Sequence, residues 1–167
     1  MQKFLLALVF FAIFASFAGL AIRNWRARAQ LQSAGFSAPA EVLSDDSKAL
    51  AKVNAQYVAT TVLGDPLNRV NAYGLGIRGK ASISLHESGI AIDRKGERSL
   101  AIALASLDSF EFAQATIDRV VERDGLLQIN WNHEQNRFST FLRVTGASNR
   151  KTLENTLQTL AIRKATK

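Results

Sequence analysis

Residues 80–93, KASISLHESGIAID, decide the fold of this chain. Apolar side chains recur there at every second position on both sides of a polar turn, as Ala81, Ile83, Leu85, Ile90 and Ile92. A period of two is that of a β-strand with one buried face, because successive side chains of a strand point to opposite sides. Residues 87–89 (Glu-Ser-Gly) supply the turn. The stretch therefore predicts an antiparallel hairpin that covers one side of a hydrophobic core.

The same alternation continues on both sides of this hairpin. We expect further strands at residues 57–63, 100–104, 110–112, 119–122, 127–131 and 138–144, with a glycine-containing hairpin loop at 123–125. Seven or eight short strands separated by turn residues are typical of an antiparallel sandwich or barrel. The aromatic side chains expected to point inward are Phe110, Phe112, Trp131 and Phe138. Phe141 alternates outward, either beneath a covering helix or as part of a contact surface.

The pattern becomes helical after Gly146. Leu153, Leu157, Leu160 and Ala161 recur at helical spacing, and Ser148 or Asn149 could cap the start of the helix. A single amphipathic helix at this position is expected to close the open end of a small barrel. We therefore assign residues 56–147 to the barrel, and residues 148–167 to the closing helix and a basic tail. The predicted class is α+β, mainly β.

The N-terminal region has a different character. Residues 4–22, FLLALVFFAIFASFAGLAI, are nineteen residues without a charge, amide or proline. As a helix they would extend roughly 28 Å, close to the ~30 Å hydrocarbon core of a bilayer. Residues 1–22 are therefore predicted to be a short flank and one transmembrane helix. Small residues four apart, Ala12 with Ser16 and Ala15 with Gly19, would permit weak self-association, although such spacings are common by chance in Ala-rich helices.

The charges flanking this helix predict its orientation. Lys3 precedes the apolar run, whereas Arg23, Arg26 and Arg28 follow it. The flank richer in Lys and Arg stays in the cytoplasm, so we expect the N-terminus outside and residues 23–167 inside, at the plasma membrane. These arginines and Trp25 would contact the lipid headgroups. The alternative is a secretory signal cleaved at Ser16-Phe17-Ala18, a small-x-small site, but the apolar run passes that site and arginines follow at once.

Residues 23–55 are predicted to be a basic juxtamembrane segment and a flexible tether. Residues 23–34 can prolong the membrane helix until Gly35 and Pro39 break it, and small polar residues follow. A flexible chain of about twenty residues spans about 25 Å on average.

Composition restricts the function. Residues 23–167 carry 20 of the 21 Lys and Arg residues and all 14 acidic ones, a formal charge of +6. That excess fits a surface near anionic lipid but lacks the basic stripe typical of nucleic-acid binding. The absence of cysteine excludes disulfides and thiol catalysis. His86 and His133 fall in predicted turns, each beside a glutamate that would point to the opposite face. No catalytic, metal or cofactor site is therefore predicted.

Seven strands followed by one C-terminal helix form the outline of a pleckstrin-homology-like (PH-like) barrel. In addition, residues 57–61 (YVATT), Asp65, 69–70 (RV) and 74–81 (GLGIRGKA) resemble the opening of a family of small actinobacterial single-pass membrane proteins. The resemblance implies one N-terminal helix followed by a bacterial PH-like domain, often encoded near pyrimidine-biosynthesis genes. Some members are loosely labelled transporter or export protein. The similarity reaches about Val144, is distinctive only over residues 57–92, and implies no ligand.

The long connection at residues 64–79 is the candidate binding segment. In PH-like barrels the loop between the first two strands often lines the ligand or membrane face. Arg69, Arg78 and Lys80 could there donate to phosphate or contact the bilayer. In the structural alternative, Arg69 pairs with Asp65 and the glycines only permit a tight path.

These features predict a membrane-anchored, non-enzymatic binding module whose cytoplasmic PH-like domain recognises a protein, a peptide or a lipid headgroup. An accessory subunit of a membrane transport or export complex is the alternative, with the helix packed against a larger membrane protein. A secreted domain and an enzyme are weaker hypotheses.

The membrane-anchor prediction can be tested on the protein in its native membrane. We expect N-terminal sequencing to begin at or next to Met1, because the uncharged run is retained as an anchor. Protease added to intact cells should leave the region beyond Arg28 undigested. A mature chain that begins near Gly19, or digestion from outside, would contradict the prediction.

Overall fold

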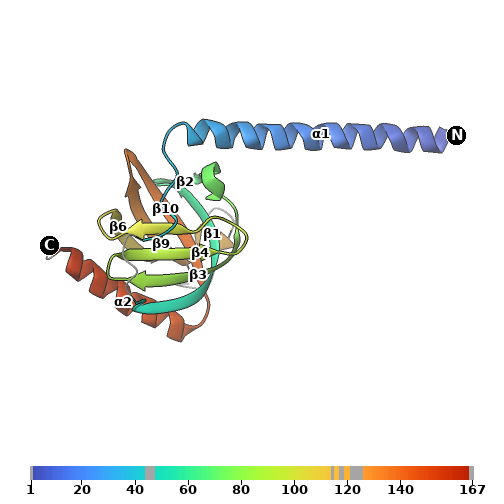
Figure 1. Ribbon diagram of the computed structural model, residues 1–167. Helices are drawn as coiled ribbons and strands as arrows, with labels where there is room; N and C mark the ends of the chain where they lie inside the picture. Colours follow the sequence, from blue (N-terminus) through green and yellow to red (C-terminus); the bar gives the residue numbers. More distant parts are fainter. Residues whose placement is uncertain (1, 44–47, 114, 117–118, 121–125, 166–167) are drawn as a thin grey trace.

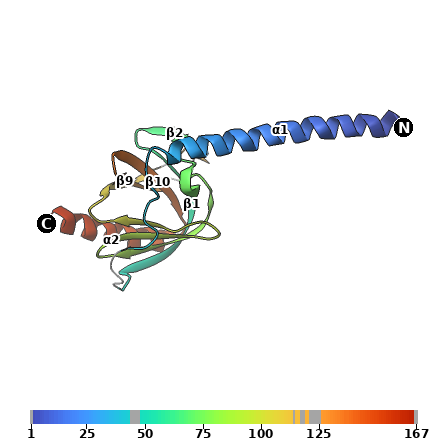
Figure 2. The same ribbon diagram turned by 45° about the horizontal axis from the view of Figure 1, so that its top comes forward.

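The computed structural model describes residues 2–43, 48–113, 115–116, 119–120 and 126–165. A long helix, α1 (Gln2–Ser33), extends from a β-barrel that carries a second helix, α2 (Ala147–Ala165), at its far end (Figures 1 and 2). By length and composition α1 can cross a membrane. A signal sequence near the N-terminus can have the same length and composition. The helix ends at Ser33, as its sequence predicted, because Gly35 follows.

The barrel is one antiparallel sheet. Its strands are β1 (Ala51–Val62), β2 (Asp65–Arg69), β3 (Gly79–His86), β4 (Gly89–Arg94), β5 (Leu100–Ala103), β6 (Leu107–Ala113), β9 (Leu126–His133) and β10 (Asn136–Val144). Their order is β5-β4-β3-β1-β10-β9-β6, with β2 beside β1. A 3₁₀ turn, η1 (Ala72–Gly74), follows β2, and β7 (Ala115–Thr116) pairs with β8 (Arg119–Val120) as a separate ribbon.

The long strand β1 joins the two halves of the sheet. Residues 51–57 pair with β3, and residues 55–62 pair with β10 on the other side. The register with β10 shifts between Tyr57 and Ala59. An irregularity of this kind bends and twists a strand locally. As a result, the two halves of the sheet face each other and enclose a core.

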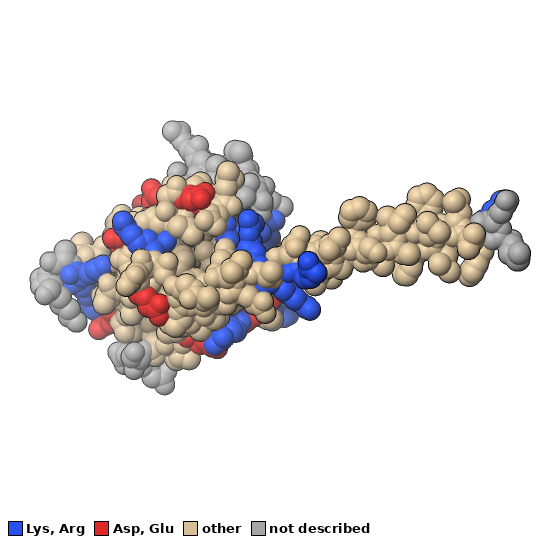
Figure 3. Space-filling view, turned by 90° about the horizontal axis from the view of Figure 1, so that it is seen from above, with Lys and Arg blue, Asp and Glu red and all other residues tan. Residues whose placement is uncertain are grey.

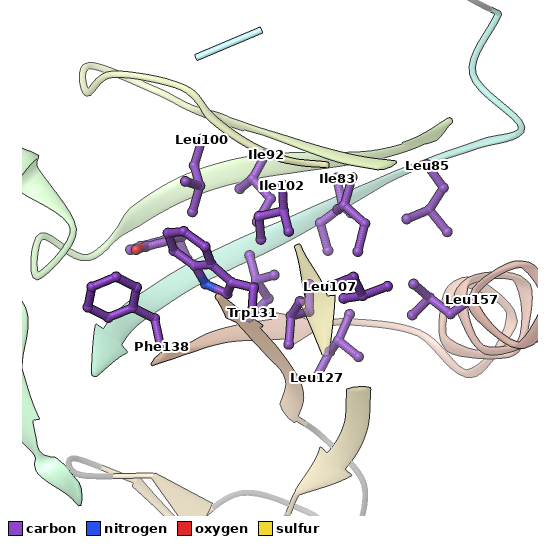
Figure 4. Close-up of a cluster of buried hydrophobic side chains, with 14 of the residues drawn as sticks. Ile83, Leu85, Ile92, Leu100, Ile102, Leu107, Leu127, Trp131, Phe138 and Leu157 are labelled. Carbon is purple, nitrogen blue, oxygen red and sulfur yellow. The ribbon is translucent and has the colours of Figure 1, made fainter. Parts of the chain in front are cut away.

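That core is built from the alternating residues that the sequence indicated. Ile83 and Ile92 lie on one side of the cluster, opposite Leu127 and Trp131, and Leu157 of α2 lies at one end (Figure 4). Leu153 and Leu160 are fully buried with Leu157, so the closing role predicted for the C-terminal helix is confirmed. Arg163 of α2 also pairs with Glu87 in the β3–β4 turn at 2.6 Å.

Four buried polar side chains form a continuous chain of hydrogen bonds through the core. Trp131 Nε1 donates to Thr140 Oγ1 (2.9 Å), which lies 2.7 Å from Thr60 Oγ1. Thr60 Oγ1 lies 2.6 Å from the Tyr57 hydroxyl, which donates to the Leu75 carbonyl at 2.9 Å. If each threonine hydroxyl donates to the next oxygen, every hydroxyl donates once and accepts once. The chain thus satisfies groups whose burial would otherwise be costly.

Several local predictions need correction. The first strand begins at Ala51, not Tyr57, because residues 51–57 pair with β3. The predicted loop at 64–79 contains β2 and η1. The C-terminal helix begins at Ala147, before its predicted caps. Phe141 does face away from the core, but it is buried in a second cluster with Val58 and Leu126. The predicted loop at 123–125 and the end of the predicted strand at 119–122 lie outside the described residues.

The buried Tyr57 makes alkaline stability testable. Burial raises the pKa of Tyr57 to about 12, from about 10 in an unfolded chain. The contribution of Tyr57 to the free energy of unfolding is therefore fully present below pH 10. As the pH rises from 10 to 12 this contribution, on the order of 2–3 kcal/mol, is lost. We expect urea unfolding of the full chain in detergent, monitored by circular dichroism, to show this loss.

Tyr57→Phe should be less stable at pH 8, by about 1 kcal/mol per lost hydrogen bond, but its stability should fall less between pH 10 and 12. Tyr73→Phe is the matched control, because it retains Tyr57 and hence the steep fall. Equal slopes for the wild type and Tyr57→Phe would contradict the assignment.

Candidate functional site: the junction of helix α1 and the barrel

The last turn of α1 is hydrogen-bonded to the barrel through Gln32. Gln32 Nε2 donates to the Arg69 carbonyl at 3.1 Å. Its Oε1 accepts from the backbone N–H of Asn71 (2.6 Å) and of Ala72 (3.3 Å). One amide side chain therefore satisfies three backbone groups in the β2–η1 connection. The helix end and the long connection are held together at this point.

Phe36 inserts into the barrel immediately after the helix. Its side chain is 8% exposed and belongs to the main core cluster. Its ring centroid lies 5.4 Å from that of Tyr73 and 5.0 Å from that of Phe138. The Tyr73 hydroxyl donates to the Phe36 carbonyl at 2.8 Å. Burial of a phenylalanine contributes roughly 1.5–3 kcal/mol, so Phe36 fastens the chain that leaves α1 to the barrel.

The next residue docks on the hairpin between β9 and β10. The Ser37 hydroxyl and N–H donate to the Glu134 carboxylate, and these hydrogen bonds hold the pKa of Glu134 below its usual value. His133 Nε2 donates to the Ser37 carbonyl at 3.0 Å. His133, which the sequence placed in a turn, is instead the last residue of β9 and bonds the segment after α1. Its ring packs against Phe36 and lies above Trp131.

The chain then crosses to the edge strand β5. The Ala40 carbonyl accepts from the Ala101 N–H at 2.7 Å, and Glu41 pairs with Arg98. Residues 36–41 of the predicted flexible tether are thus bonded to the barrel at several points, and its residues 51–55 belong to β1. The sequence interpretation failed here because it weighed the small polar residues and not the single aromatic, Phe36, among them.

The long connection follows a path that its glycines make possible. Tyr73 and Gly74 both have positive φ, at 54° and 69°, which is costly for tyrosine. The hydrogen bond from Tyr73 to Phe36 helps to hold this conformation. A Cβ at Gly76 would lie 2.7 Å from Asn71 Oδ1, so the backbone approaches its neighbours too closely for a side chain. The glycine-rich sequence therefore has a structural role at the junction.

Arg94 holds the other side of this connection, and sequence reasoning missed it. Arg94 is 5% exposed, and its guanidinium carbon lies 4.9 Å from the Tyr57 ring centroid. It donates to the carbonyls of Gly74 and Arg98, each at 2.7 Å. Carbonyl oxygens and an aromatic face compensate part of the cost of burying the cation. The only sequence signal was a turn, residues 94–97, that gave no indication of burial.

The three predicted cations of this connection do not form one cluster of equivalent residues. Arg69 is half-buried, and its Nη1 donates to the Gly76 carbonyl at 3.4 Å. Arg78 and Lys80 are exposed. The N–H of Lys95 donates to the Lys80 carbonyl at 2.9 Å, so the β4–β5 turn brings a further exposed lysine beside Lys80. Lys80 and Lys95 line a shallow hollow of about 370 Å³.

The residues predicted to contact the headgroups lie on the exposed surface of α1. Arg23, Trp25, Arg26 and Arg28 are all exposed, and the apolar half of the helix before them is exposed too. Figure 3 shows Lys and Arg side chains gathered around the place where the shaft of α1 meets the barrel. The arrangement places positive charge on the helix and on the barrel beside the junction.

The barrel, its closing helix and the bonded N-terminal helix together define a PH-like domain with a candidate membrane helix. The comparison of families agrees, because residues 33–159 match the family described as Bacterial PH domain-like. The chain belongs to this family. Among curated proteins, none matches the sequence significantly. The actinobacterial source and the gene neighbourhood implied by the resemblance stay predictions.

The junction predicts a fixed orientation of the barrel relative to α1. The chain has no cysteine, so cysteines placed at exposed Asn24 and Thr145 would carry the only spin labels. We expect a narrow distribution of label distances in the full chain by pulsed electron paramagnetic resonance. Gln32→Ala combined with Phe36→Ala should broaden it, because Phe36→Ala alone removes packing worth on the order of 3 kcal/mol.

Leu31→Ala is the control variant. Leu31 lies beside Gln32 and is 78% exposed, so its removal should leave the distribution unchanged. A broad distribution in the unaltered chain would show that the barrel is not held by the junction.

Proposed function

We propose that this protein is a membrane-anchored, non-enzymatic binding module. In this proposal α1 spans the plasma membrane with the N-terminus outside, and the PH-like barrel lies at the cytoplasmic face. The Lys and Arg bias around the apolar run supports the orientation. The observation that carries the proposal is the junction through Gln32 and Phe36, because it bonds the barrel to the end of the candidate anchor.

Helix geometry supports a barrel close to the headgroups. Residues 22–33 would extend α1 by roughly 16 Å beyond the hydrocarbon. The headgroup layer accounts for roughly 5–8 Å on each side of a bilayer. The β4–β5 turn lies at the end of the barrel from which α1 extends (Figure 1). A barrel bonded to the last turn of the helix would therefore direct that end back toward the membrane surface.

The charges at that end suit an anionic surface. Lys80 and Lys95 are adjacent and exposed, and Arg94 lies buried behind them with its charge directed at backbone carbonyls. A lysine near an anionic membrane contributes about 1 kcal/mol of attraction. With Arg23, Arg26 and Arg28 on the helix, they would hold the barrel against phosphatidylserine-like or phosphatidylglycerol-like headgroups. The binding would depend on charge rather than on one lipid.

Charge reversal at this end tests the proposal. The full chain is placed in nanodiscs with anionic lipid, with a fluorophore on a single cysteine at Asn54, which lines the same hollow. Quenchers attached to the lipid headgroups should quench it in the unaltered chain. Lys80→Glu with Lys95→Glu should reduce the quenching strongly, as should ionic strength near 1 M.

Lys48→Glu with Lys151→Glu is the matched control, because it makes the same change of charge at exposed residues elsewhere. The fluorophore on this variant should be quenched as strongly as on the unaltered chain. Equal quenching in both double variants, or none in any of them, would contradict contact between this end of the barrel and the headgroups.

The second candidate is an accessory subunit of a membrane transport or export complex. One observation favours it: the small residues Ala12 and Ser16 leave a hollow of about 340 Å³ on the surface of α1, bordered by Phe17. Such a hollow suits close packing against another membrane helix. Purification in mild detergent distinguishes the outcomes. A stoichiometric polytopic protein supports the accessory role, whereas a second copy of this chain supports self-association through α1.

A further inference from the structure

The two edge strands of the sheet differ in how far their outward backbone groups are hydrogen-bonded. At one edge, the Ala101 N–H of β5 is satisfied by the Ala40 carbonyl, and Glu41 and Arg98 pair beside it. At the other edge, β6 pairs with β9 on one side and with no other described strand. Lys164 of α2 donates to the Leu107 carbonyl at the start of β6. The rest of β6 has no such cover among the described residues.

The register shows which backbone groups of β6 point outward. The Asn132 N–H of β9 donates to the Ser106 carbonyl, so Asn132 is directed at the β6 side. Alternation along β9 then directs Asn130 and Gln128 at their partners Ser109 and Glu111. The intervening residues, Phe110 and Phe112, therefore direct both their N–H and C=O groups away from β9. An edge of this kind is a template for an added strand.

A groove lies beside this edge. It has a volume of about 720 Å³ and is lined by Phe110, Glu111 and Phe112 of β6 and by residues of α2 that include Arg150, Lys151 and Glu154. A second hollow of about 450 Å³ continues it along Leu107–Phe110 toward Ala161 and Lys164. Phe110 and Phe112 are half-buried, so their rings form an apolar floor with exposed surface. The groove runs along the strand, as an extended peptide would.

The charges around the groove restrict its occupant. The α2 side carries Arg150, Lys151 and Lys164 against one acid, Glu154, whereas the strand side carries the exposed Glu111. On the strand side, Asp108 is paired with Arg137 at 2.6 Å. An occupant that adds to β6 and faces α2 is therefore favoured if it is acidic on its helix-facing side. Both α2 and β6 lie on the side of the barrel away from the N-terminal end of α1, which favours a soluble partner over the bilayer (Figure 1).

We propose that the groove between β6 and α2 binds an extended acidic peptide segment of a partner protein. The segment would add to β6 as an antiparallel or parallel strand through the backbone groups of Phe110 and Phe112. An apolar side chain would pack on the two phenylalanine rings, and an acidic one would face Arg150 and Lys151. Main-chain pairing supplies affinity and the side-chain contacts supply specificity in strand addition. The proposal names the partner class of the binding module proposed above.

The test selects random linear dodecapeptides, displayed on phage, against the full chain in nanodiscs. We expect the enriched peptides to share an apolar residue next to acidic residues and to lack proline at the paired positions. A synthetic peptide of the enriched sequence should slow hydrogen exchange at the amides of Phe110 and Phe112 at least tenfold. Lys151→Glu should weaken its binding at least tenfold, whereas Lys48→Glu, at an exposed lysine that lines neither hollow, should not change it.

Three results would overturn the proposal. The first is selection without a shared acidic and apolar sequence. The second is a peptide that binds but leaves exchange at Phe110 and Phe112, or affinity in Lys151→Glu, unchanged. The third is slow exchange of these amides in a dimer without peptide, which would make the groove an interface between two copies. Failure of headgroup quenching leaves this experiment unaffected, because peptide binding is measured directly on the groove.

Discussion

The attachment of Gln32 and Phe36 to the barrel is the constraint on which the rest of the molecule depends. A helix and a barrel joined by a free chain would have no fixed relation to each other. Here one amide satisfies three backbone groups of the β2–η1 connection, and one aromatic ring enters the core directly after the helix ends. Because Gln32 and Phe36 lie within five residues of each other, the direction of α1 determines which end of the barrel is on the side toward which the helix extends.

The same connection is held from inside the barrel. Tyr57 donates to the Leu75 carbonyl, and Arg94 donates to the Gly74 carbonyl while it packs on the Tyr57 ring. The positive φ of Tyr73 is costly, and a buried polar group without a partner costs a comparable amount. The structure compensates these costs because each group has a partner. A segment that reads as a loose glycine-rich loop is thus bonded to both the core and the end of α1.

A barrel that is open between two edge strands must protect both from unwanted pairing. The segment after α1 covers β5 through the hydrogen bond between Ala40 and Ala101. Among the described residues, only the Lys164 side chain bonds to the outer edge of β6. The open edge, the aromatic floor and the cations of α2 lie together, at the end of the barrel away from the bilayer in the proposed arrangement. Membrane contact and partner binding can then occur at opposite ends. In that arrangement, attachment to a membrane would also raise the local concentration, so that a weak peptide interaction would suffice.

Residue patterns were enough to predict the alternating strands, the inward aromatics such as Trp131, the closing helix and the uncharged apolar run, because each depends on periodicity or on unbroken hydrophobicity. The tertiary structure decided what depends on contacts between residues far apart in sequence. The burial of Phe36 on the β9–β10 hairpin, the carbonyl partners of Arg94 and the pairing of Lys80 with the β4–β5 turn carry no local signal. The strand order likewise decided that β6 is an edge, since no single segment contains the information about its missing neighbour.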